Sequence, residues 1–135
     1  FFKQKTAYEI PKRDWSSDVC SSDLSQSSLS TFAEAIGSSS HQIPPTFLIT
    51  FSIAAAEEFL PSLGFDWSRV VHGEQRFQHF RQITAGDALR VTSEIESYKS
   101  LAGNEFVTVR SDFEDISTTE KISSTWSTLV FRGAE

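Results

Sequence analysis

The chain has 135 residues, a formal net charge of −6 and a single cysteine. This acidic balance leaves no basic stripe that could follow a phosphate backbone, so the composition argues against binding to nucleic acid. No apolar run approaches the roughly 18 residues that a membrane-spanning helix needs. The three histidines are scattered without the spacing of metal ligands, so we expect no metal site.

The first 24 residues stand apart from the rest. Back-translated into codons, residues 1–10 resemble the flow-cell primer of short-read sequencing libraries, and residues 14–24 resemble the second-read adapter. We therefore expect residues 1–24 to be an adapter-derived artefact with no domain, and leave them out of fold reasoning. Residues 25–135 suffice for one domain with its own core. The sequence contains no methionine, so we expect this domain to be N-terminally truncated.

Two helices are predicted before the β-rich part of the chain. Apolar residues at 29–36 recur at helical spacing, and Gly37 follows as a left-handed stop. A second helix is predicted over 46–60, directly after two prolines. Its first eleven residues are apolar or small almost all round, which is typical of a helix that is buried on every face. We expect this helix to form the centre of the fold.

The remainder of the chain predicts β-strands. Alternating segments are expected over 70–83, 89–98, 106–113 and 122–132, with turns at 85–87, 101–104 and 115–119. In the hairpin turn at 101–104, Gly103 can take the positive φ that a tight turn needs. One buried helix followed by antiparallel strands of about ten residues predicts an α+β fold, in which a curved sheet wraps around the helix.

Several short motifs, in this order and spacing, resemble one family. They are FAEAIG at 32–37, PPTF at 44–47, HGEQ at 72–75, AGD at 85–87 and STLV at 127–130. The combination resembles the MaoC-like dehydratase N-terminal family, whose members are hot-dog-fold domains similar to subunits of the mycobacterial hydroxyacyl-ACP dehydratase. The resemblance covers nearly all of residues 29–135 and implies a long antiparallel sheet around a buried helix.

The resemblance also implies a chemistry, the dehydration or hydration of acyl thioesters carried on coenzyme A or acyl carrier protein. In active members an Asp and a His on a D-x-N-P-x-H stretch supply the acid/base pair. This chain has only Ser-Ser-Ser-His-Gln at 38–42, so the aspartate is absent and His41 stands alone. Domains of this type commonly serve as the inactive partner of a catalytic half.

The resemblance therefore implies an acyl-thioester-binding, non-catalytic half of an (R)-specific 3-hydroxyacyl-CoA/ACP dehydratase of fatty-acid metabolism. Such a half has no catalytic residues of its own and no cofactor besides the carrier of the acyl group. We expect a hetero- or homodimer with a MaoC-type hot-dog domain, in the cytoplasm. A truncated, pseudogene-like fragment is a further possibility.

Thr46 and Phe47 are the candidate substrate-binding residues on the central helix. Their backbone N–H groups lie at its expected start, where the helix dipole and free donors polarise a thioester carbonyl. Pro45 has no N–H to donate, so the next two residues would supply the donors. The alternative is that Thr46 only caps the helix.

His72, Gly73 and Glu74 are the candidate substrate-binding residues on the first long strand. His72 could border the substrate tunnel or a dimer seam, and a glycine inside a strand indicates a bulge or a close approach. Alternatively, His72 bonds a backbone carbonyl and Glu74 faces solvent. A self-contained hydratase, or an acyl-CoA thioesterase with Glu74 or His72 as base, also stays open. His79 lies further along this strand, where a slipped strand pairing would exchange its face.

Overall fold

The computed structural model describes residues 16–20, 26–38 and 43–133, with the backbone alone for 16–20 and 26. The helices are α1 (Gln26–Ala35), α2 (Ile49–Phe59) and the short 3-10 helices η2 (Pro61–Leu63) and η3 (Trp67–Arg69). The strands are β1 (Ser16–Cys20), β2 (Val70–His79), β3 (Leu89–Leu101), β4 (Asn104–Asp115) and β5 (Lys121–Phe131).

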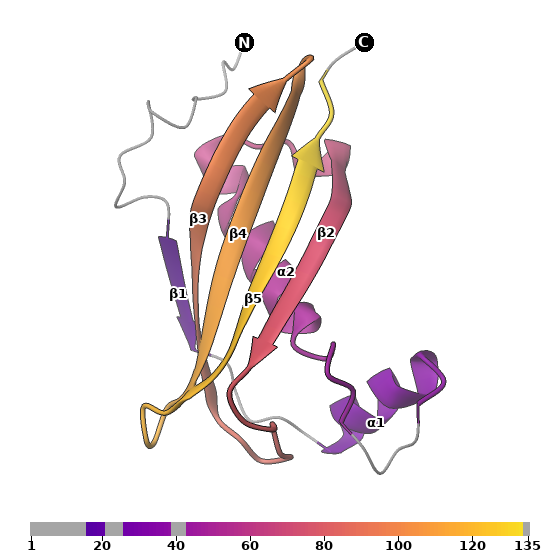
Figure 1. Cartoon of the computed structure of the whole chain (residues 1–135), viewed down its shortest axis with the longest axis vertical. Coiled ribbons are helices and arrows are strands. Elements are labelled where there is room, and N and C mark those ends of the chain that lie inside the picture. The colour runs from indigo at the N-terminus through magenta and orange to yellow at the C-terminus, as the bar shows by residue number, and fades with distance from the viewer. Residues whose placement is uncertain (1–15, 21–25, 39–42, 134–135) are drawn as a thin grey trace.

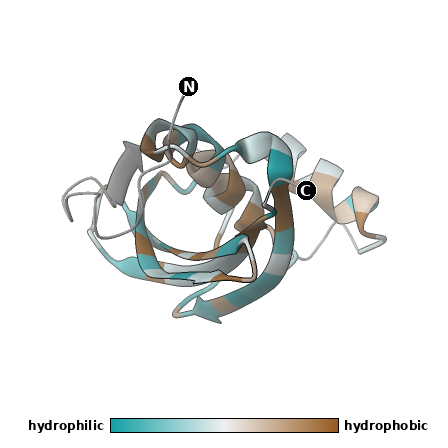
Figure 2. Cartoon of the chain, turned by 90° about the horizontal axis from the view of Figure 1, so that it is seen from above, coloured by the Kyte–Doolittle hydropathy of each residue, from teal (hydrophilic) through white to brown (hydrophobic). Residues whose placement is uncertain are grey.

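All strands join in one antiparallel sheet with the order β1-β3-β4-β5-β2. The strands β2 to β5 lie across one side of α2, and α1 lies beyond the N-terminal end of that helix (Figure 1). Seen from above, the sheet curves around α2 (Figure 2). The expected α+β arrangement of a curved sheet around a central helix is confirmed.

The backbone of β1 extends the sheet at the β3 edge. It runs antiparallel to β3, with Ser16 opposite Glu94 and Cys20 opposite Arg90. An edge strand offers a row of unpaired N–H and C=O groups, which an extended segment can satisfy whatever its sequence. The adapter origin of residues 1–24 therefore stays a prediction. Residues 1–15 and 39–42, the latter with His41, lie outside the described part of the chain.

The first helix ends as its sequence predicts. Gly37 has a φ of 74°, and the Ser38 N–H donates to the Ala33 carbonyl at 2.8 Å, which is the pattern of a Schellman stop. Leu29 and Ala33 are buried, but Ile36 is 53% exposed. The expected apolar face is thus one residue too long, because Ile36 lies after the last helical turn.

The central helix begins three residues later than predicted. The Phe47 N–H donates to the Pro44 carbonyl at 3.0 Å, and the Ile49 N–H donates to the Thr46 carbonyl at 3.1 Å. These bonds span three residues, so the chain enters the helix through a tight turn, and regular α-helix starts at Ile49. No side chain caps this end of α2, so the Thr46 hydroxyl has no capping role.

The expectation that α2 is buried on every face is wrong for the single chain. Ser52, Ala55, Ala56 and Phe59 are buried, whereas Ala54, which lies among the first eleven residues, is exposed. The sheet covers only one side of the helix, so apolar residues that point away from it keep part of their surface accessible.

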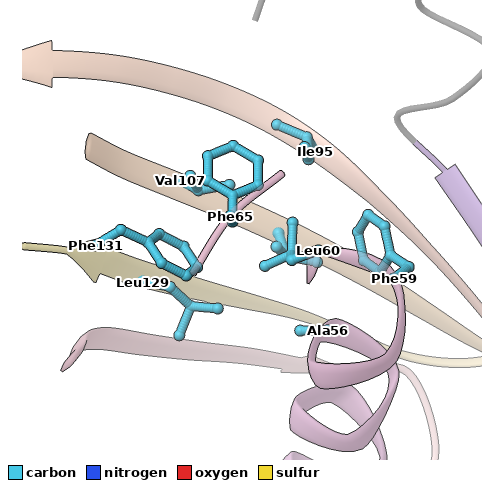
Figure 3. Close-up of a cluster of buried hydrophobic side chains, with 9 residues drawn as sticks. Ala56, Phe59, Leu60, Phe65, Ile95, Val107, Leu129 and Phe131 are labelled. Carbon is cyan, nitrogen blue, oxygen red and sulfur yellow. The ribbon is translucent and has the colours of Figure 1, made fainter. Parts of the chain in front are cut away.

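Two clusters of buried apolar side chains form the core, one at each end of α2. The first consists of Leu29, Phe47, Leu48, Ile83, Leu89, Val91, Phe113 and Ile122. The second consists of Ala56, Phe59, Leu60, Phe65, Ile95, Val107, Val109, Leu129 and Phe131 (Figure 3). Between them, Ser93 and Ser111 face each other across β3 and β4 with their hydroxyls 2.7 Å apart.

Buried and accessible residues alternate along β4 as predicted, whereas a bulge interrupts the alternation on β3. Residues 107, 109, 111 and 113 of β4 are buried and their neighbours are not. On β3 a bulge between Ile95 and Ser97 shifts the register, so Ser97 is exposed rather than facing inward with Ile95. The hairpin turn uses Ala102 and Gly103 with φ of 53° and 79°, which confirms the expected tight turn.

Candidate functional site

An open cleft of about 840 Å³ lies beside the N-terminal approach to α2. One wall is the double-proline segment, and the other is the connection that follows β2. The lining residues are Ile43, Pro44, Pro45, His79, Phe80, Arg81, Gln82, Ile83 and Thr84. A volume of this size is ordinary for a site that holds a small molecule.

The wall that follows β2 is held in place by Arg81. Its guanidinium contacts Asp87 at 3.0 Å, Asp115 at 3.2 Å and Glu120 at 3.3 Å. The hydrogen bond to Asp87 raises the pKa of Arg81, which therefore stays charged. β2 ends at His79 instead of continuing to residue 83, and the next residues lead into this ion-pair network.

Asp87, the last residue of the AGD motif, anchors the same wall from the other side. It accepts hydrogen bonds from the Thr84 N–H at 2.9 Å and from Arg81 at 3.0 Å. Burial alone would raise the pKa of Asp87, but these hydrogen bonds and the Arg81 charge outweigh it and lower the pKa below its ordinary value. Asp87 is thus an ionised structural residue.

The two candidate substrate-binding residues before α2, Thr46 and Phe47, lie in different surroundings. Phe47 is buried in the first core cluster, with its ring 5.3 Å from that of Phe32 in an edge-on arrangement, and its N–H is taken by the Pro44 carbonyl. Thr46 is exposed. Within the described part of the chain, the N–H groups of Thr46 and Leu48 have no acceptor. Leu48 is completely buried, so of these two groups only the Thr46 N–H is accessible to a ligand. Substrate binding by Thr46 and Phe47 stays a prediction.

The HGEQ motif lies elsewhere, at a bulge in β2. The register shifts between His72 and Glu74, and the His72 Nε2 lies 3.1 Å from the Glu74 carbonyl oxygen. A Cβ at Gly73 would meet its nearest neighbours at 3.4 Å, so the glycine marks a bulge rather than an obligatory close approach. None of the three residues lines the cleft, and their predicted role in substrate binding stays a prediction.

Glu74 lines a second, shallow hollow of about 200 Å³ instead. The other lining residues are Arg76, Glu96, Ser97, Thr108, Trp126 and Thr128. The Arg76 guanidinium lies 4.0 Å from the centroid of the Trp126 ring. The alternation of β4 and β5 places Thr108, Trp126 and Thr128 opposite the core-facing side chains, so this hollow belongs to the outer face of the sheet.

His79 lines the cleft, and the sequence alone did not decide which face of the sheet its side chain is on. The pairing of β2 with β5 sets it opposite Ser123, and its Nδ1 lies 3.0 Å from the Ser123 hydroxyl. Its ring stacks on Phe77 with the planes 17° apart. The strand register decides this placement, and residues 79 and 123 are too far apart in the chain for local periodicity to reveal it.

Among the described residues, no three His, Cys, Asp or Glu side chains are grouped to hold a metal ion. None of the described helices is long and apolar enough to cross a membrane.

The comparisons with known proteins identify the family. The family model described as the FAS1-like dehydratase domain region matches residues 13–117. The chain belongs to this family. A UPF0336 protein of Streptomyces griseus is 47% identical over 105 residues, which are 76% of this chain and 69% of that protein. A UPF0336 protein of Saccharopolyspora erythraea is 43% identical over 103 residues, which are 75% of this chain and 65% of that protein.

Solved structures similar to this chain confirm the hot-dog fold. The HadBC (3R-hydroxyacyl-ACP dehydratase) complex of Mycobacterium tuberculosis matches with a TM-score of 0.72 and 18% identity, over 85% of this chain and 95% of that chain. HtdX of the same organism matches with a TM-score of 0.77 and 14% identity, over 87% of this chain and 51% of that chain. A MaoC-like dehydratase matches with a TM-score of 0.73 and 21% identity, over 87% of this chain and 42% of that chain. The resemblance to MaoC-like dehydratases is confirmed.

Proposed function

We propose that this chain is the acyl-thioester-binding, non-catalytic half of an (R)-specific 3-hydroxyacyl-CoA/ACP dehydratase. The observation that carries the proposal is the cleft beside the start of α2. It lies beside a free backbone donor, the N–H of Thr46, and none of its described lining residues carries a carboxylate. The role requires no cofactor besides the carrier of the acyl group, and we place it in fatty-acid metabolism in the cytoplasm.

The backbone supports thioester binding. The N–H of Thr46 lies in the turn that leads into α2, on an exposed residue, and has no acceptor among the described residues. Donors that are fixed before a ligand arrives stabilise a carbonyl oxygen at no cost in reorganisation. Pro44 and Ile83 give the cleft buried apolar surface, which suits the acyl chain next to that carbonyl.

The side chains support the absence of catalysis. Elimination of water needs a base for the α-proton and an acid for the leaving hydroxyl, both within hydrogen-bond reach of the substrate. His79 lines the cleft, but none of the described lining residues is an Asp or a Glu that could complete an acid/base pair with it. The nearby carboxylate of Asp87 is engaged by Arg81 and Thr84. We therefore assign the acid/base pair to a partner.

The edge of the sheet supports a partner domain. β2 is the last strand in the order, and residues along it are largely exposed. Such an edge offers a row of backbone donors and acceptors for strand pairing. Phe80, just beyond β2, is 49% exposed. We propose that a MaoC-type hot-dog domain carrying the acid/base pair docks along β2, beside the cleft.

The proposal is tested with crotonyl-CoA and the purified chain. We expect saturable binding by calorimetry and no loss of the enoyl absorbance. Thr46→Pro removes one N–H and should weaken binding, whereas Thr46→Val keeps that N–H and should not. Circular dichroism checks that both variants fold. Hydration or thioester hydrolysis by the chain alone, lost in Glu74→Gln, would instead establish the self-contained enzyme.

A further inference from the structure

The hydrogen bonds around Ser123 fix the tautomer of His79. The Ser123 hydroxyl lies 3.0 Å from the Gln78 carbonyl oxygen and 3.0 Å from the His79 Nδ1. It has a single proton, and a carbonyl oxygen can only accept. Both contacts are hydrogen bonds only if the hydroxyl donates to Gln78 and accepts from His79. The neutral ring of His79 therefore carries its proton on Nδ1.

This tautomer leaves the His79 Nε2 as a free acceptor at the cleft. Ser123 is completely buried, and the His79 ring stacks on Phe77 at 5.8 Å, so the imidazole is held on two sides. Within the described part of the chain, Nε2 has no hydrogen-bond partner. His79 itself is exposed and lines the cleft.

Two neighbouring polar groups of the cleft are already engaged. The guanidinium of Arg81 is shared among Asp87, Asp115 and Glu120. The Thr84 hydroxyl donates to the Asp87 carboxylate at 3.1 Å. The guanidinium can only donate, and the Thr84 hydroxyl has already given its one proton to Asp87. Of these three groups, the Nε2 of His79 is therefore the acceptor whose direction is fixed by a ring that its neighbours hold in place.

We propose that the His79 Nε2 accepts a hydrogen bond from a neutral donor of the bound acyl thioester, with Ser123 as the residue that positions the ring. This inference rests on the proposed function and makes His79 a specificity-determining residue of the same cleft. Two donors of such a ligand fit this chemistry, the 3-hydroxyl of the acyl group and an amide N–H of the carrier arm. An unprotonated ring nitrogen favours either over an anionic group.

The tautomer is measured first, on the full chain, by long-range ¹H–¹⁵N spectra at about pH 8.5, where imidazoles are neutral. His72 is an internal control, because its Nε2 faces the Glu74 carbonyl and must carry the proton. We expect opposite tautomers for His79 and His72. The spectrum of His79→Asn assigns the signals. An Nε2–H tautomer at His79 would overturn the inference whatever the chain binds.

Binding is then measured with two N-acetylcysteamine thioesters, (R)-3-hydroxybutanoyl and butanoyl, which differ only in the hydroxyl. His79→Asn keeps a donor near the Nδ1 position and removes Nε2, whereas His79→Gln offers an amide oxygen near Nε2. We expect His79→Asn to weaken binding roughly three- to tenfold, the range of one neutral hydrogen bond, with partial rescue in His79→Gln.

The two probes distinguish the two possible donors to His79. A loss confined to the hydroxylated probe identifies the 3-hydroxyl as the donor, and an equal loss for both identifies the carrier amide. Unchanged affinity for both probes overturns the inference while the proposed function survives. If neither probe perturbs any amide signal around Thr46, the inference and the proposed function both fail.

Discussion

Arg81 and Asp87 form the ion pair that joins the end of β2 to the turn before β3, with the Arg81 Nη1 3.0 Å from the Asp87 Oδ2. The Asp87 side chain is only 14% exposed. It also accepts from the N–H and hydroxyl of Thr84, so one carboxylate closes the turn and fixes the cleft wall. The AGD motif thus contributes a structural carboxylate.

Removal of this carboxylate should destabilise the protein. We expect Asp87→Ala to lower the free energy of unfolding by about 2 kcal/mol, because it leaves the Thr84 N–H and part of the Arg81 guanidinium without partners. Urea denaturation at neutral pH measures the change. Glu114→Gln is the matched control, because its ion pair with Arg90 at 3.3 Å is more exposed and should contribute little.

Because Asp87 has a lowered pKa in the folded protein, we expect the free energy of unfolding to fall at acid pH. Its pKa in the folded protein is lower than in the unfolded chain, where an aspartate titrates near pH ~3.9. The stabilisation is therefore fully present above that value and is lost as the pH falls through the lower folded-state pKa. We expect Asp87→Asn to flatten the fall of the unfolding free energy below about pH 4. An unchanged slope would show that Asp87 is not an ion-paired carboxylate.

Two glycines should respond in opposite ways to an added methyl group. Gly103 has a φ of 79° in the β3–β4 hairpin turn, a conformation that costs an alanine roughly 1–2 kcal/mol. Gly73 needs no positive φ, and a Cβ there would meet its nearest neighbours at 3.4 Å. Thermal denaturation should therefore show Gly103→Ala melting several degrees lower and Gly73→Ala near the parent. A larger loss for Gly73→Ala would mean that the bulge itself demands glycine.

The sequence predicted the elements whose pattern is set by burial alone. β4 and the part of β5 from Thr125 onward alternate, because each packs one face on the core around α2 and turns the other outward. Gly37 and Gly103 stand where positive φ is needed. Local periodicity could not place Ser97, because one extra residue in the β3 bulge shifts everything after it to the other face. Nor could it place the start of α2, which depends on how the prolines shape the preceding turn.

The site was less accessible to sequence reasoning than the fold. The sequence identifies Thr46 as a candidate substrate-binding residue, because two prolines mark the start of the central helix. The roles of His79 and Arg81 depend on partners at Ser123, Asp115 and Glu120, which only the register of the sheet brings near. Hydrogen bonds between distant strands leave no periodic trace in one sequence.

Removal of residues 1–24 should leave a cooperatively folding domain. Both core clusters are built from residues 29–131, and β1 adds backbone pairing at one edge of the sheet. We expect a chain that starts at Ser25 to unfold in a single transition by circular dichroism and calorimetry. A broad, non-cooperative melt would indicate a truncated fragment that cannot fold alone.

The Thr125 Oγ1 is buried and has no hydrogen-bond partner within the described part of the chain. Burial of an unpaired hydroxyl costs free energy, whereas valine has nearly the same shape and no polar atom. We expect Thr125→Val to raise the free energy of unfolding by about 1 kcal/mol in urea denaturation. Thr108→Val is the matched control, because the Thr108 hydroxyl bonds that of Thr128 at 3.0 Å, and its removal should give no gain. Equal effects of the two changes would mean that the Thr125 hydroxyl is satisfied in solution.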